Sequence, residues 1–214
     1  GFTFPENFNY PYLSRTVSEF WRRWHMTLSG WFREYLYIPL GGNRRGKNRT
    51  LLNLFLVFLA TGLWHGASWQ FVAWGLWYAV LLILERTLLQ KPLAVLPVPL
   101  TRLYTLFFVV CGWVIFRAPG LRAGLLWLRA MLLPTDGFAA WPVSRYLDPR
   151  TLVLLAVGLA LCGPVQALWP RLRQALYDQE ETGPAQSLAL LALGFVCLTL
   201  LVSGTYNPFI YFRF

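Results

Sequence analysis

Two histidines, His25 and His65, are the residues of this 214-residue chain whose type and position favour catalysis. His65 lies within an apolar run, 51–84, in which Asn53 and Gln70 are the other strongly polar side chains. The helical rise places His65 roughly 20 Å beyond the start of that run. An ionisable group at such depth in a membrane is a functional hypothesis by default, and a neutral imidazole can accept a proton as a general base. The alternative is a structural histidine hydrogen-bonded between helices.

The second histidine, His25, follows two arginines in the sequence RRWH, about forty residues before His65. A surface position on a basic helix and a role beside His65 are both open for it. A metal site is not expected from either histidine. They are far apart in the sequence, carboxylates are few, and no Cys or His follows at the short spacing of zinc ligands.

A short basic loop, 43–49, reads NRRGKNR and precedes the apolar run. By the positive-inside rule this loop should face the cytoplasm. Its cations would attract a phosphate-bearing donor by charge alone. The alternative, that they only determine membrane topology, is the favoured interpretation of the loop by itself.

Composition places these residues in a membrane. The chain is 57% hydrophobic and 13% charged, whereas a soluble domain carries about 25% charged residues. We therefore predict an all-α fold, that of a polytopic helical membrane protein. The net charge of +10 is typical of Lys and Arg in loops that face anionic lipid, so nucleic acid is not expected as a partner. The chain opens on Gly1 without a signal segment, and we expect a piece of a longer protein.

The apolar run 51–84 is too long for one membrane helix. As a straight helix it would extend about 50 Å, against a hydrocarbon core of about 30 Å. We expect it to break at Gly62 or within His65–Ser68. A break inside a membrane is tolerated only where protein or a water-filled cavity surrounds it. The length of the run therefore predicts a cavity beside His65.

Periodicity and end signals predict the other helices. The pattern at Thr16–Glu19 predicts a capped helix that runs to about Ile38. Residues 121–133 predict a short amphipathic helix that is interfacial or re-entrant. Further spans are expected over 100–116, over 151–169 with a kink or end at Gly163-Pro164, and over 187–203. The cysteines are expected to be buried and free; they are Cys111, Cys162 and Cys197.

Three stretches of the sequence carry a resemblance to a known family. They are PENFNYPYLSRTVSEFWRRWHMTLSGWFREYLYIPLGGNR, GLWHGASWQFVAWG and the terminal NPFIYFRF. In them the chain closely resembles the membrane-bound O-acyltransferase (MBOAT) family, and within it the bacterial alginate O-acetyltransferase-like branch. The resemblance covers the whole chain, and members begin further upstream. It implies that residues 1–214 are the C-terminal part of a single MBOAT membrane domain.

The resemblance also implies a site and a reaction. The invariant histidine of the family matches His65, and its second signature position matches His25. Members form a transmembrane tunnel, which is narrowest near the invariant histidine. An acyl thioester, either acetyl-CoA or an acyl carrier protein, would arrive from the cytoplasmic side and an acceptor hydroxyl from the other side. The implied location is the bacterial inner membrane, which the chain would cross several times.

We hypothesise that His65 takes the proton of the acceptor hydroxyl as it attacks the thioester carbonyl, while His25 orients the acceptor or stabilises charge. The acceptor would be a polysaccharide such as alginate, or a periplasmic acetyltransferase partner. Two other classes stay open, a non-catalytic scaffold or acyl-group conduit and a transporter that uses His65 as a proton relay. The candidate substrate contacts are Trp64 beside His65 and, for the phosphates of the donor, Arg22, Arg33, Arg44, Arg45 and Lys47.

Overall fold

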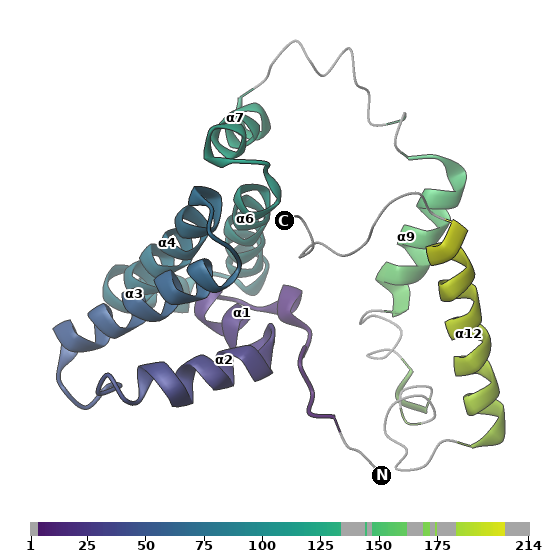
Figure 1. The fold of residues 1–214 in the computed structure, drawn as a ribbon, viewed down its shortest axis with the longest axis horizontal. Helices are drawn as coiled ribbons and strands as arrows, with labels where there is room; N and C mark the ends of the chain where they lie inside the picture. Colours follow the sequence, from purple (N-terminus) through teal and green to yellow (C-terminus); the bar gives the residue numbers. More distant parts are fainter. Residues whose placement is uncertain are drawn as a thin grey trace. The chain divides into compact units, whose positions relative to one another are not determined.

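The computed structural model describes residues 4–133, 144, 147–161, 169–171, 174 and 183–203. Its regular structure over these residues is helical, as the composition predicts (Figure 1). Contacts divide the chain into two units, 1–141 and 142–214, and each is described by itself. The first unit contains both histidines and consists of η1 (Pro11–Leu13), α1 (Val17–Arg23), α2 (Met26–Phe32), the π-helix η2 (Arg33–Tyr37), α3 (Lys47–Trp64), α4 (Trp69–Leu84), the π-helix η3 (Glu85–Leu89), α5 (Gln90–Val95), α6 (Val98–Arg117) and α7 (Leu121–Leu132).

The described helices of the second unit are α9 (Pro149–Leu161) and α12 (Pro184–Ser203). They agree with the predicted spans 151–169, in its first part, and 187–203. The predicted kink at Gly163-Pro164 lies outside the described residues.

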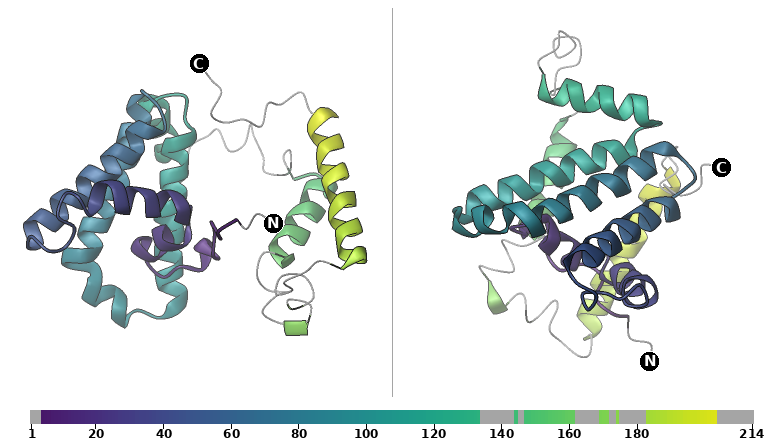
Figure 2. Two further views of the ribbon diagram at one scale, coloured as in Figure 1. Left: turned by 60° about the horizontal axis from the view of Figure 1, so that its bottom comes forward. Right: turned by 90° about the vertical axis from the view of Figure 1, so that its left-hand side faces the viewer.

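The apolar run 51–84 is broken beside His65, as its length predicts. Helix α3 ends at Trp64 and α4 begins at Trp69, and the two pack against each other as a hairpin (Figure 2). Their close approach depends on glycine. A Cβ on Gly62 or on Gly75 would lie 2.4 Å from a backbone oxygen of the facing helix. The helix before the break also begins earlier than predicted, because Lys47 of the basic loop already belongs to α3.

The prediction of one continuous helix from Thr16 to about Ile38 is wrong at Trp24 and His25, where the helix is broken; the residues on both sides are helical, as predicted. The start of this helix is confirmed, because the Thr16 hydroxyl accepts a hydrogen bond from the backbone N–H of Glu19 at 3.0 Å. The helix then stops at Arg23, and the chain turns through His25 before α2 and η2 continue the path. The N-terminal segment takes up the backbone groups at this break: Asn9 N donates to Arg23 O and Met26 N to Asn7 O, both at 2.9 Å.

Aromatic side chains form the core of the first unit. Phe20 and Trp21 of α1 pack with Trp74 and Tyr78 of α4, and the exposed fractions of these four are between 0% and 9%. Helix α6 approaches closely, since a Cβ on Gly112 would lie 2.3 Å from the Tyr78 hydroxyl. The core therefore packs α1, α4 and α6 against one another.

The free cysteines match their prediction in part. Cys111 is buried in α6, as expected. Cys197 is exposed on α12, because no described residue covers that side of the helix, so its predicted burial is wrong. Cys162 lies outside the described residues.

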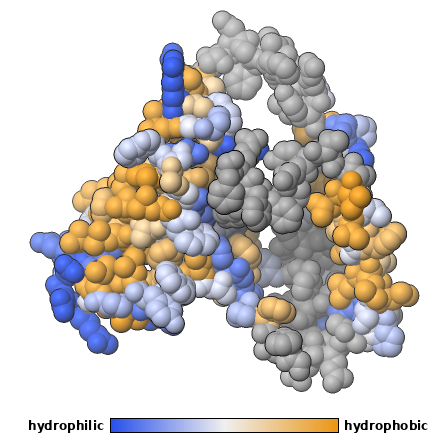
Figure 3. All heavy atoms as spheres, viewed as in Figure 1, coloured by the Kyte–Doolittle hydropathy of each residue, from blue (hydrophilic) through white to orange (hydrophobic). Residues whose placement is uncertain are grey.

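Two segments of the described chain are long and apolar enough to cross a membrane, Trp69–Val95 and Val98–Arg117. The second confirms the helix predicted over 100–116, and α7 confirms the helical character of 121–133. Apolar side chains cover much of the visible face of the first unit, while hydrophilic residues gather where α2 leads into α3 (Figure 3). This distribution is typical of a protein whose solvent on most sides is lipid.

Candidate functional site

His65 lies in the turn that joins α3 to α4. Its backbone N–H donates to Gly62 O at 3.1 Å, which tightens the last turn of α3. Gly66 follows with φ of +148°, and a Cβ there would approach the Phe71 ring to 2.8 Å. Ser68 then returns to extended backbone and begins α4. The turn thus needs glycine at Gly66, and it places the imidazole where two helices meet.

Aromatic rings surround the His65 imidazole. Its centroid lies 4.8 Å from that of Trp64, 5.0 Å from Trp74 and 5.0 Å from Phe116. The rings of Trp74 and Phe116 stand at 88° and 89° to the imidazole, which is the favoured edge-to-face arrangement. Rings from α3, α4 and α6 therefore orient the imidazole. The side chain as a whole remains half-buried.

His25 occupies a strained position between α1 and α2. Its backbone lies in the left-handed region, with φ of 46° and ψ of 53°. That region is uncommon for residues other than glycine, although Asn, Asp and His tolerate it best. Such strain persists only where surrounding contacts impose it, and it is found often at functional sites.

Asn7 supplies the contact that orients His25. Its Oδ1 lies 3.2 Å from His25 Nδ1 and also accepts hydrogen bonds from the backbone N–H and the hydroxyl of Thr27. Because this oxygen acts as an acceptor, Nδ1 must carry the proton, and Nε2 of the neutral ring is left as the acceptor. Burial lowers the pKa of His25 below its ordinary value, which favours that neutral form.

A line of aromatic rings connects the two histidines. Phe8 contacts both His25 and Trp24, with centroids at 6.1 and 4.9 Å. Trp24 contacts Trp113 at 4.9 Å, and Trp113 contacts Phe116, the neighbour of His65, at 6.4 Å. The two imidazoles are also near enough for their charges to interact. The structure thus brings together two histidines that are far apart in the sequence.

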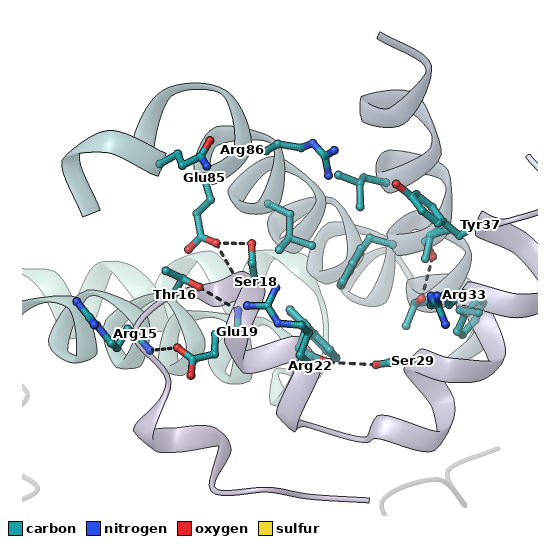
Figure 4. Close-up of a pocket in the computed structure, with 18 of the residues that line it drawn as sticks. Arg15, Thr16, Ser18, Glu19, Arg22, Ser29, Arg33, Tyr37, Glu85 and Arg86 are labelled. Carbon is teal, nitrogen blue, oxygen red and sulfur yellow. Dashed lines mark hydrogen bonds between the residues drawn. The ribbon is translucent and has the colours of Figure 1, made fainter. Parts of the chain in front are cut away.

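A cavity of about 950 Å³ lies between α1–α2 and α3–α4 (Figure 4). Arg22 and Arg33, both predicted as donor contacts, line it together with Arg15 and Arg86. Its other walls are polar near α1 and apolar along α3 and α4. The apolar wall includes Leu54, Val57, Phe58 and Leu82. A cavity that combines four arginines, placed around it, with an apolar wall suits an elongated ligand with an anionic end (Figure 4).

A second cavity, of about 450 Å³, lies over the basic loop. Arg44 and Arg45 line it, and it shares Arg33 and Tyr37 with the larger cavity. The buried Asn53 shapes this loop, because its amide donates to Leu40 O at 3.3 Å and to Gly42 O at 3.0 Å. Helix α3 therefore holds the backbone that leads into the basic loop.

The predicted site residues thus fall into two groups. Trp64 contacts His65, whereas Arg22, Arg33, Arg44 and Arg45 line the two cavities. Lys47 lies at the start of α3 and lines neither cavity. Neither histidine lines them either, so a cavity at His65 itself stays a prediction.

Two polar residues that the sequence did not reveal hold this arrangement. Asn7 orients His25, and only its place in an aromatic, proline-bearing segment hinted at an ordered role. Glu85 ends the apolar run, is 5% exposed and lines the larger cavity. In the sequence, a single carboxylate at the end of such an apolar run is the feature that could have indicated a buried, hydrogen-bonded role for Glu85.

The family model described as MBOAT, membrane-bound O-acyltransferase family, matches residues 1–127. The chain belongs to this family. The matched residues include both histidines and every residue that lines the two cavities. Membership of this membrane-bound family agrees with the two candidate spans of α4–α5 and α6.

Curated relatives extend the match over the rest of the chain. The probable alginate O-acetylase AlgI of Pseudomonas aeruginosa is 35% identical, over 100% of this chain and 51% of the relative. That of Pseudomonas putida is 39% identical, over 100% of this chain and 47% of the relative. A peptidoglycan O-acetyltransferase of Helicobacter pylori is 45% identical, over 60% of this chain and 25% of the relative. The chain spans about half the length of the first two relatives.

Proposed function

We propose that the protein to which this chain belongs is an O-acyltransferase of the bacterial inner membrane. It would move an acyl group, most simply acetyl, from a cytoplasmic thioester to the hydroxyl of a polysaccharide on the other side. The observation that supports this proposal is the line of contacting aromatic rings that connects His25 and His65 within the family-matched region. Relatives named as alginate and peptidoglycan acetylases support a sugar polymer as the acceptor.

His65 would act as the general base. The acceptor oxygen attacks the thioester carbonyl carbon while its proton passes to the imidazole. The C–S bond then breaks, and the imidazolium returns the proton to the departing thiolate. No net oxidation or reduction occurs, so the reaction needs only donor and acceptor. His25, held by Asn7 with Nε2 free to accept, would orient the acceptor by accepting a hydrogen bond from a hydroxyl next to the reacting one, or would stabilise a developing positive charge.

The donor would enter over the two cavities. A coenzyme A or phosphopantetheine thioester has phosphates at one end and an acyl chain at the other. The arginines of the larger cavity suit the phosphates, and its apolar wall suits the rest of the chain. Arg33, which both cavities share, is the best placed of these cations.

The test uses the full-length protein in membranes, with radiolabelled acetyl-CoA as the donor and an alginate oligosaccharide as the acceptor. His65→Ala should abolish label transfer while the protein still accumulates and elutes as a folded species. Arg33→Gln should raise the KM for the donor and leave kcat nearly unchanged, since its contact is with the donor in ground and transition states alike. The matched control is Arg129→Gln on α7, outside both cavities. Full transfer by His65→Ala refutes the proposal.

A further inference from the structure

We propose that Glu85 is a positioning residue, which fixes α1 along its axis against α4 and thereby sets the position of His25 relative to His65. This inference rests on the proposed function. It starts from a carboxylate that is buried in a candidate membrane span, Trp69–Val95. A charged group in such a segment needs a specific partner, since an unpaired one is costly.

Glu85 contacts the first turn of α1 through both of its carboxylate oxygens. Its Oε1 accepts a hydrogen bond from Val17 N at 2.6 Å. Its Oε2 accepts from Ser18 N at 2.8 Å and from the Ser18 hydroxyl at 2.5 Å. Figure 4 shows the carboxylate directed at this turn, while the neighbouring Arg86 is directed away from it. A negative group at the N-terminus of a helix satisfies its free N–H groups and interacts favourably with its dipole.

Glu85, the first residue of η3, extends a row of buried residues that begins on α4. Trp74, Tyr78 and Glu85 are four and seven residues apart, so they lie on one helical face. The same face meets α1 twice more, because Trp21 lies 4.9 Å from Tyr78 and 5.6 Å from Trp74, between ring centroids. The row therefore pins α1 near its start through hydrogen bonds and near its middle through ring contacts.

This arrangement connects the two histidines. Helix α4 begins just after the His65 turn and ends at Leu84, the residue before Glu85. Helix α1 begins at Val17, whose N–H donates to Glu85, and ends at Arg23, two residues before His25. The two helices are thus antiparallel, with the histidines near the opposite end from the carboxylate. Apolar contacts tolerate small shifts along a helix, whereas three hydrogen bonds to one carboxylate do not. Glu85 is the directional contact that fixes α1 along its axis.

The test compares turnover of radiolabelled acetyl-CoA by full-length variants, normalised to folded protein. Glu85→Gln replaces one acceptor oxygen by an NH₂ group that faces backbone donors. We expect kcat to fall about tenfold or more, because small misplacements of catalytic groups have large effects on rate. The KM for the donor should change less than about twofold. Ser18→Ala removes one hydrogen bond and should give a smaller fall of the same kind. The matched control, Glu34→Gln, alters an exposed carboxylate of η2 outside both cavities and should match the wild type.

A double-mutant cycle separates positioning from general loss of structure. His25→Asn keeps a side chain that tolerates the left-handed backbone. If Glu85 acts through His25, then Glu85→Gln should slow His25→Asn by less than about twofold. Equal falls in both backgrounds, a rise in KM alone, or an unchanged kcat in Glu85→Gln would each overturn the inference. If His25→Asn has no measurable turnover, the kcat and KM of Glu85→Gln alone test the inference. His65→Ala, run in parallel, reports on the proposed function independently.

Discussion

Replacing Gly75 by alanine should force α3 and α4 apart. The added Cβ would lie 2.4 Å from Phe58 O and 3.3 Å from the Cα of Gly62. The first of these distances is about 1 Å short of ordinary van der Waals contact. Both opposing atoms belong to the backbone, so no side chain can rotate away. The hairpin must open, and its opening moves the turn that carries His65.

The expected magnitude is the balance of two effects. An alanine in a helix interior is favoured over glycine by roughly 1 kcal/mol. An extra methyl group in a close-packed interior costs about 1–3 kcal/mol, and an obstacle made of backbone places Gly75 at the upper end. The net change should be a loss of about 2 kcal/mol of stability. Gly30, inside α2, is the matched control because a Cβ there has nothing within 4 Å. Gly30→Ala should stabilise by about 0.5–1 kcal/mol.

The two substitutions therefore differ in sign, which the denaturation midpoints of the purified full-length variants in detergent would measure. Acetyl transfer should fall in Gly75→Ala and be unchanged in Gly30→Ala. If Gly75→Ala is as stable as Gly30→Ala, the two helices do not cross this closely and the reasoning is refuted.

Other substitutions test the loop and His25. Asn53→Leu should leave Gly42 O without its buried donor, and stability should therefore fall by about 1–3 kcal/mol. Tryptic cleavage of the basic loop should become faster. The control Asn48→Leu, on the exposed side of α3, should change neither stability nor cleavage. His25→Val should lower the unfolding midpoint more than His25→Asn, because a β-branched residue tolerates a φ of 46° poorly; equal midpoints would contradict this. Because burial lowers the pKa of His25, the unfolded chain binds a proton at higher pH than the folded chain does. Acidification from about pH 7.5 to about pH 5.5 should therefore lower the unfolding midpoint of the wild type more than that of His25→Asn. Equal decreases of the two midpoints would contradict this prediction.

The sequence predicts the local structure well where one strong physical constraint decides it. The run that contains His65 exceeds the thickness of a membrane, so a break is required. Of the two predicted places, His65–Ser68 is confirmed and Gly62 is wrong, because Gly62 lies inside α3. The N-terminal break at His25 had no such constraint. Helical periodicity continues across it, and His25 turns the chain because Asn7, a residue eighteen positions earlier, holds the ring and the next turn. A tertiary contact of this kind leaves no periodic signal in the sequence.

The basic residues show the same limit. Charge alone marked Arg22, Arg33 and Lys47 equally as donor contacts. The structure separates them, since the first two line the larger cavity and the third lines neither cavity. What decides is the tertiary path of the chain, which brings η2 into contact with α3 and places Arg33 in the lining of both cavities. The cation set was predictable from composition, but its selection required the tertiary path of the chain.

Glu85 shows which signal a sequence can offer for such contacts. It follows Trp74 and Tyr78 at helical spacing, so the pattern already places it on the buried face of the helix. A carboxylate on a buried face must find donors on the element that packs there. The donors need not be lysine or arginine, and here they are the free N–H groups at the start of α1 and one serine hydroxyl. A search limited to opposite charges misses this contact, whereas a search for helix starts such as Thr16–Glu19 would find it. The buried carboxylate and the capped helix start complement each other as acceptor and donors. Together they predict that the start of α1 lies next to the end of α4.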